Sequence, residues 1–442
     1  MGLLNIFIVA FWLLITGAHP FPFPEPDGGL APPDPLTDPN ISPGGLVSKN
    51  STSFQIMGGS PDRAERALDW LEGAFDCFAV KLQWGPPHTS IVNFETHKGP
   101  FPKLDVYSVK SLLSGKAAGL FNSNPKTGKV WLEVVDQYLD SGATIHEYGH
   151  SLHHFQNAWL YEGHTQPWME AFSNWVQDTY RTSEICASSR EKHKQGTHPT
   201  VFDPQRVLGY SYRVIVHAST GGGNHYEAWP FLTYLTNNPD NFAGLGQDSV
   251  RQLHLQYKMG SKETPLHTLS RISKNATVGD IVGRYWARMA YVDINHPLAQ
   301  EKFYQERGKI NLANVEDIGN GTYKPHPERR PQYMGANIIP IKAFGWEFEV
   351  KVASDDEFVA TVAIHRRQCK SSYVTLVNGA AKVHVLPEDE VSVVVANAPA
   401  EPILYDGYRL SKEVTKGLDY TLEMTGAVAV KYTVVVEGTK QK

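Results

Sequence analysis

Cysteine is scarce in this chain, with three residues in 442. The chain can therefore close at most one internal disulfide, and one thiol is left over. Its stability must come from folded cores and not from a disulfide framework. The sequence alone does not indicate which two of Cys77, Cys186 and Cys369 would pair.

A surplus of basic residues is also missing, because 41 Lys and Arg stand against 46 Asp and Glu, for a net charge of −5. Nucleic-acid binding depends on neutralising phosphates with such residues, so we expect no nucleic-acid partner. The chain is too long for one compact core, and two folded units with tails are the expectation.

Long apolar runs are absent apart from residues 6–15, a stretch too short to span a bilayer comfortably. Small residues follow it at 16–18, where a signal peptidase would cut, so residues 1–18 are predicted to be a signal peptide. We expect a secreted, extracellular glycoprotein without a membrane anchor. Four glycosylation sequons favour the same route, and they begin at Asn40, Asn50, Asn275 and Asn320.

The part of the chain that follows is Pro-rich, and residues 19–59 are predicted to be a spacer or pro-segment. Regular structure is expected to begin at Ser60 and Pro61, a helix N-cap followed by proline at the first helical position. Runs of β-branched and aromatic residues then predict strands at 78–84, 104–109 and 130–135. The last of these is expected at the edge of a sheet, where an extended peptide could pair with it.

The sequence pattern changes near residue 325. Apolar residues at helical spacing predict helices before that point, at 142–156, 167–179, 226–236, 248–258 and 278–291. Short runs between turn residues predict strands after it, at 358–365, 373–377, 381–386, 391–396 and 427–436. Residues 326–442 are therefore predicted to form an all-β, sandwich-like domain.

One motif points to chemistry, the sequence His146-Glu147-Tyr148-Gly149-His150. Residues i and i+4 of a helix share a face, so both imidazoles can bind one metal ion. We predict that His146 and His150 are metal ligands and that the ion is Zn²⁺. Glu147 lies beside them, where it can act as a general base.

A catalytic zinc usually takes three protein ligands, and Glu170 is the predicted third. It stands 20 positions after His150, on the next predicted helix, which can return antiparallel over the imidazoles. The alternative is a solvated glutamate, as most glutamates are. His153 and His154 lie one helical turn further along, about 5.4 Å away, so we expect them behind the ligands or on the surface.

This arrangement resembles the gluzincin metallopeptidases over residues 144–174. In that clan an aspartate four residues after the glutamate often orients a histidine ligand. Asn174 occupies that position here, so this role is expected to be altered or taken by another acid. The wider chain resembles a family of secreted microbial zincin-like proteins with an HExGH motif, a Trp-rich helix that bears the glutamate, a His-Tyr-x-x-Trp segment (residues 225–229) and a C-terminal β-module.

The resemblance implies an α+β fold. A zincin-like catalytic domain over residues 60–325, with a small sheet plus active-site and backing helices, would precede the sandwich-like domain. It also implies hydrolysis of peptide bonds, in which Glu147 accepts the proton of a zinc-bound water and passes it to the leaving amine.

An oxyanion donor is also needed, and Tyr226 is the predicted one, with His217 and His225 as alternatives. The other interpretation of Tyr226 is a core aromatic at the start of a helix. Two further functions are open: a zincin-like ligand-binding protein with weak or no catalysis, and a hydrolase of a non-peptide bond. Binding of glycan by the β-module is a hypothesis by analogy.

Overall fold

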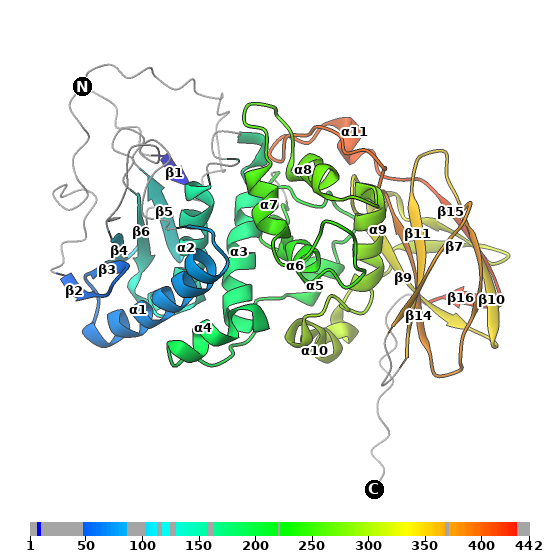
Figure 1. The fold of residues 1–442 in the computed structure, drawn as a ribbon. Coiled ribbons are helices and arrows are strands. Elements are labelled where there is room, and N and C mark those ends of the chain that lie inside the picture. The colour runs from blue at the N-terminus through cyan, green and yellow to red at the C-terminus, as the bar shows by residue number, and fades with distance from the viewer. Residues whose placement is uncertain are drawn as a thin grey trace, which may run out of the picture. The chain divides into compact units, whose positions relative to one another are not determined.

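The computed structural model of the chain describes residues 7–9, 47–85, 103–112, 117–123, 130–156, 159, 163–219, 222–366 and 371–430. The chain divides into two compact units, Met1–Thr200 and Val201–Lys442 (Figure 1). The predicted signal peptide and the predicted spacer lie outside the described residues, apart from residues 7–9 and 47–59. No helix within the described ranges is long and apolar enough to cross a membrane.

The first unit is built on a six-stranded mixed sheet with the order β1-β5-β6-β4-β3-β2. The strands β3, β4 and β6 run parallel to one another, and the remaining pairings are antiparallel. The six strands are β1 (Phe7–Val9), β2 (Val47–Asn50), β3 (Phe54–Met57), β4 (Leu104–Val109), β5 (Gly119–Ser123) and β6 (Val130–Val135). The predictions for β4 and β6 are confirmed.

The position predicted for β6 is wrong, because this strand does not lie at an edge. It pairs with β4 on one side and with β5 on the other. The sequence of β5 has no β-branched residue and begins with glycine, so its strand signal is weak and this second neighbour was not predicted. Regular structure also begins earlier than Ser60, since β2 and β3 form an antiparallel pair before it.

Two helices, α1 (Pro61–Phe75) and α2 (Gly142–Phe155), pack against each other and against the sheet (Figure 1). The start of α1 is as predicted, because the side chain of Ser60 accepts a hydrogen bond from the backbone N–H of Arg63. A third helix, α3 (Pro167–Thr182), packs along α2. The two helices predicted in this region are therefore confirmed.

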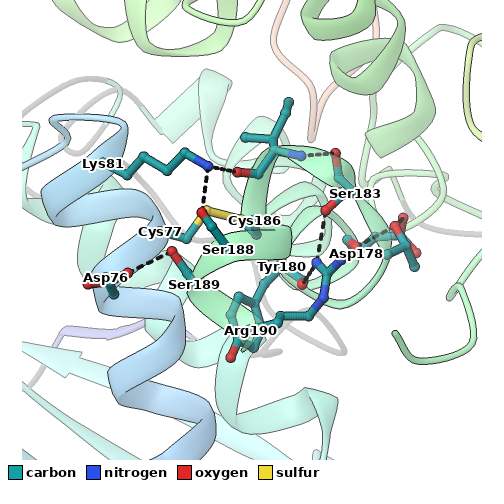
Figure 2. The surroundings of a disulfide bond; sticks show 12 residues. Asp76, Cys77, Lys81, Asp178, Tyr180, Ser183, Cys186, Ser188, Ser189 and Arg190 are labelled. Carbon is teal, nitrogen blue, oxygen red and sulfur yellow. Dashed lines mark hydrogen bonds between the residues drawn. A yellow bond between two sulfur atoms is a disulfide. The ribbon is translucent and has the colours of Figure 1, made fainter. Parts of the chain in front are cut away.

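The strand predicted at residues 78–84 is wrong, because a π-helix, η1 (Asp76–Lys81), continues α1 there. Cys77 in this segment is buried and forms a disulfide with Cys186, 109 positions along the chain (Figure 2). Lys81 Nζ donates a hydrogen bond to the carbonyl of Ile185 over 2.7 Å. Packing and this covalent link outweigh the local β-propensity of the segment.

The second disulfide partner lies in a short helical turn, η5 (Glu184–Cys186), which is followed by α4 (Ala187–Lys192). The hydroxyl of Ser189 donates to Asp76 over 2.8 Å, in the surroundings that Figure 2 draws. Burial opposes ionisation of Asp76, but Lys192 and Ser189 together lower its pKa. The pairing leaves Cys369, which lies outside the described residues, as the cysteine without an intrachain partner.

The second unit begins with helices. They are α5 (Pro204–Leu208), α6 (Trp229–Asn237), α7 (Ser249–Leu255), α8 (Pro265–Ile272), α9 (Val278–Met289) and α10 (Pro297–Glu306). The predicted helices at 226–236, 248–258 and 278–291 correspond to α6, α7 and α9. Because α6 starts at Trp229, Tyr226 lies in the turn before this helix and not within it.

Two five-stranded antiparallel sheets follow, with the orders β13-β10-β15-β8-β7 and β12-β11-β14-β9-β16. Their strands are β7 (Val315–Gly319), β8 (Thr322–Pro325), β9 (Ala336–Ala343), β10 (Glu347–Ala353), β11 (Val359–His365), β12 (Ser372–Thr375), β13 (Ala380–His384), β14 (Glu390–Ala396), β15 (Thr421–Thr425) and β16 (Ala427–Ala429). A short helix, α11 (Lys412–Thr415), precedes β15. The apolar core lies between the two sheets, where Phe348 and Val350 of β10 share one cluster with Val393 of β14.

One face of the second sheet is covered by helix α9, which contacts β9, β11 and β14. The strands β11 and β14 are consequently buried on both faces. The helices of residues 204–306 thus belong to the same compact unit as the sheets, and the predicted domain boundary at residues 325–326 falls inside that unit. The fold is α+β with a β-rich C-terminal region, as predicted.

Candidate metal centre

The HExxH motif lies on α2, and close packing of α3 against this helix brings the later glutamate to it. A Cβ atom added to Gly149 would lie 2.8 Å from the Cα of Ser173, so any larger residue would push the two helices apart. The glycine of the motif is therefore a packing requirement of the α2–α3 pair. Ser141 caps the start of α2 by accepting a hydrogen bond from the N–H of Ala143.

The three predicted ligands come together. Glu170 Oε2 lies 3.2 Å from His146 Nε2 and 3.5 Å from His150 Nε2, and all three ligand atoms lie within 4.8 Å of one another. These separations are short enough for the three atoms to approach a single ion. The side chains are 11 %, 2 % and 14 % exposed for His146, His150 and Glu170, respectively. This group could hold a metal ion.

The charges of the cluster favour a cation among these side chains. Burial would raise the pKa of Glu170, but the neighbouring imidazoles of His150 and His146 hold it well below its usual range. Burial would lower the pKa of His146, and the carboxylates of Glu170 and Glu147 raise it. The cluster therefore keeps an ionised carboxylate in a buried setting, which is stable only with positive charge nearby.

Glu147 is buried beside the ligands, and burial raises the pKa of its carboxyl group. The backbone N–H of Phe121 on β5 donates a hydrogen bond to that carboxylate. A Cβ atom on Gly119 would lie 2.5 Å from Cγ of Glu147, so only glycine lets β5 approach this closely. No sequence signal links Gly119 to the motif, because the contact is formed through space.

The two further histidines of α2 are not on the surface, so that part of the expectation is wrong. His153 is fully buried, with its ring 5.1 Å from that of Trp159. His154 is 7 % exposed, and its ring lies 5.2 Å from that of Phe121. Burial lowers the pKa of His154 to about 4, so this side chain is neutral at neutral pH. Neither residue belongs to the group that could hold a metal.

Asn174 stands where the gluzincin resemblance implies an aspartate that orients a histidine ligand. Its Oδ1 accepts a hydrogen bond from Nδ1 of His146 over 2.8 Å. With the proton on Nδ1, the lone pair of Nε2 faces Glu170 and is available to a metal. Glu170 and Asn174 are four residues apart on α3 and share a face, as His146 and His150 do on α2.

The predicted oxyanion donors belong to the second unit. Tyr226 is half-buried, and its ring lies 4.6 Å from the ring of His225. His217 is 5 % exposed, its Nδ1 is 2.8 Å from the hydroxyl of Ser219, and burial lowers its pKa to about 4. Tyr226 is therefore not a core aromatic at a helix start, and its catalytic role stays a prediction.

The fold and the site define the class of this protein. It is an α+β protein with a largely buried His-His-Glu group on two packed helices. The chain belongs to a family described as a family of unknown function (DUF6055), which matches residues 67–355. The matched residues include the candidate metal centre, Asn174 and Tyr226. No curated protein matches the chain.

Proposed function

We propose that the protein is a secreted, zinc-dependent metallopeptidase of gluzincin type. The observation that carries the proposal is the buried group of His146, His150 and Glu170, with Glu147 adjoining it. Two imidazoles and one carboxylate with a neighbouring glutamate are the donor set of hydrolytic zinc sites. Zinc, when bound, would polarise the scissile carbonyl and acidify the attacking water.

The remaining chemistry falls to side chains of the chain itself. Glu147 would accept a proton from the attacking water and return it to the leaving amine. Its raised pKa suits this exchange, because a catalytic base works best when its pKa approaches the working pH.

Secretion is part of the proposal, and the disulfide supports it. Disulfides persist in oxidising compartments and are rare in the cytosol, and the bond between Cys77 and Cys186 holds two buried segments together. The predicted signal peptide over residues 1–18 points to the same compartment.

The test combines metal analysis with peptide cleavage by the purified full-length mature chain. We expect about one zinc per chain, loss of the metal in His146→Ala, and a 10²- to 10⁴-fold loss of cleavage in Glu147→Gln with the metal retained. Glu133→Gln is the matched control, since this half-buried glutamate of the same unit hydrogen-bonds to Asn122 and Trp131 and is outside the metal group.

Two outcomes would redirect the proposal. Unchanged metal content in His146→Ala would mean that the ligand set is wrong. One zinc per chain without cleavage of a broad peptide library would favour the ligand-binding protein or the hydrolase of a non-peptide bond, and a parallel screen of glycan-bearing amides and esters separates these two.

A further inference from the structure

We propose that Asn174 is a neutral positioning residue of the metal centre, and that its lack of charge makes the centre hold its metal less tightly than a carboxylate there would. The inference rests on the proposed metal site and concerns how strongly that site retains its ion. It assigns a function to a residue that touches a ligand and not the metal itself.

The geometry places Asn174 behind one ligand. The amide oxygen of Asn174 accepts from Nδ1 of His146 over 2.8 Å, while Nε2 of the same ring faces Glu170 over 3.2 Å. The two nitrogens of the imidazole are therefore used in opposite directions. A hydrogen bond at one nitrogen sets the tautomer and the ring orientation that the other nitrogen presents to a metal.

Packing limits the freedom of this contact. Asn174 follows Ser173, whose backbone is pressed against Gly149 on α2. Glu170 and Asn174 lie on the same face of α3, directed at the helix that carries the two histidines. The same helix–helix contact thus positions both the third ligand and the residue behind the first ligand.

Two carboxylates already act on the ring of His146. They are those of Glu170 and Glu147, which are assigned as ligand and base. A carboxylate at the position of Asn174 would bind the Nδ1 proton more strongly and add one negative charge near the cation. The amide keeps the orientation and omits that charge.

We expect two substitutions of similar size at this position to change the metal affinity in opposite directions. Asn174→Asp keeps the shape and the acceptor and adds the charge, so we expect zinc to bind at least about tenfold tighter. Asn174→Leu keeps the size and removes the acceptor, so we expect zinc to bind roughly 10- to 100-fold more weakly.

The experiment titrates the metal-free full-length mature chain with Zn²⁺ against a competing chelator and records the visible spectrum of the Co²⁺-loaded protein. Gln137→Glu is the matched control, because it makes the same charge change on an exposed residue of the same unit. Near-ultraviolet circular dichroism of each metal-free variant verifies that the fold is retained.

Tighter binding in Asn174→Asp and weaker binding in Asn174→Leu, with an altered Co²⁺ spectrum and unchanged zinc affinity in Gln137→Glu, is the supporting result. Equal affinity of the wild type and Asn174→Asp would overturn the inference and leave the proposed peptidase intact. If the wild type binds no metal, both this inference and the proposed function are wrong.

Discussion

The two units of the molecule bury charged side chains in different ways. In the second unit, Arg288 donates to both carboxylate oxygens of Asp240, at 2.6 and 2.9 Å, and to Asp293 at 3.0 Å. Asp240 and Asp293 thus each have a partner of opposite sign. In the first unit, Glu147 and Glu170 are buried together, and the side chains next to them that can carry positive charge are imidazoles.

The difference shows how a ligand site can be recognised beside a structural ion pair. A buried ion pair is complete when every charge is neutralised and hydrogen-bonded. The cluster on α2 and α3 instead places two carboxylates beside imidazoles, and the ligand atoms of His146, His150 and Glu170 lie within 4.8 Å of one another. A bound cation would balance the two carboxylates, whereas nothing needs to be added to Arg288 and its partners.

The largest expected effect tests whether the first unit depends on its covalent link. The disulfide spans 109 positions, so replacing both Cys77 and Cys186 by Ser should destabilise this unit by about 4–5 kcal/mol. Hydrogen exchange of the full chain should show faster exchange over α2, with β14 of the second unit unchanged. Cys369→Ser is the control, and equal acceleration in both units would show that the disulfide does not act on the first unit alone.

The paired charges of the second unit can be broken directly. Arg288→Met removes the nearest cation from Asp240 and Asp293, which keep hydrogen bonds from tyrosine hydroxyls, so it should destabilise the second unit by about 1–3 kcal/mol in urea unfolding. Arg206→Met is the control, because its side chain is 66 % exposed and its ion pair contributes under about 1 kcal/mol. Equal effects of the two substitutions would remove the contrast between the units.

Acid should destabilise the first unit through His154. The pKa of this histidine is about 4 in the folded chain and near 6.5 when unfolded, so between these values the unfolded chain binds the proton and the folded chain does not. Stability therefore falls as the pH drops from about 6.5 to 4, by about 3 kcal/mol at most.

This pH effect is measured as the unfolding free energy of metal-free wild type and of His154→Leu across that range. The substitution should flatten the curve of the first unit. A slope that persists unchanged in His154→Leu would show that another group is responsible.

The smallest expected effect concerns Gly149. Gly149→Ala would place a Cβ atom 2.8 Å from the backbone of Ser173, costing about 1–3 kcal/mol and moving α3 and Glu170 away from the histidines. Weaker zinc binding in a chelator competition is the readout. Gly163→Ala is the matched control, since nothing lies within 4 Å of its added Cβ. Unaltered zinc affinity in Gly149→Ala would show that the helix packing tolerates the methyl group.

Local patterns predicted a large share of the fold and of the metal group. The helices α2 and α3 and the strands β4 and β6 follow from periodicity and bounding residues, which act over a few positions. The ligand set of His146, His150 and Glu170 followed from helical spacing and from the number of ligands that zinc requires. Helical periodicity and bounding residues are properties of neighbours along the chain, whereas the choice of Glu170 also used the number of ligands.

Other features depended on segments far apart in sequence. The π-helix at residues 76–81 and its disulfide replaced a predicted strand, and β5 moved β6 from the edge to the interior of the sheet. Burial of His153 and His154 likewise depends on which segments cover α2. Packing between distant segments decides such features, and a local sequence pattern does not predict it.

The sequence by itself determined that this chain carries an HExxH helix, because helix geometry is encoded within a few residues. It also determined that a glutamate follows at a separation along the chain that suits a third ligand. Tertiary structure alone decided that Gly149 admits α3 and that Gly119 and Phe121 meet Glu147. Each of these contacts joins two elements whose approach is governed by side-chain volume and hydrogen bonding across the fold.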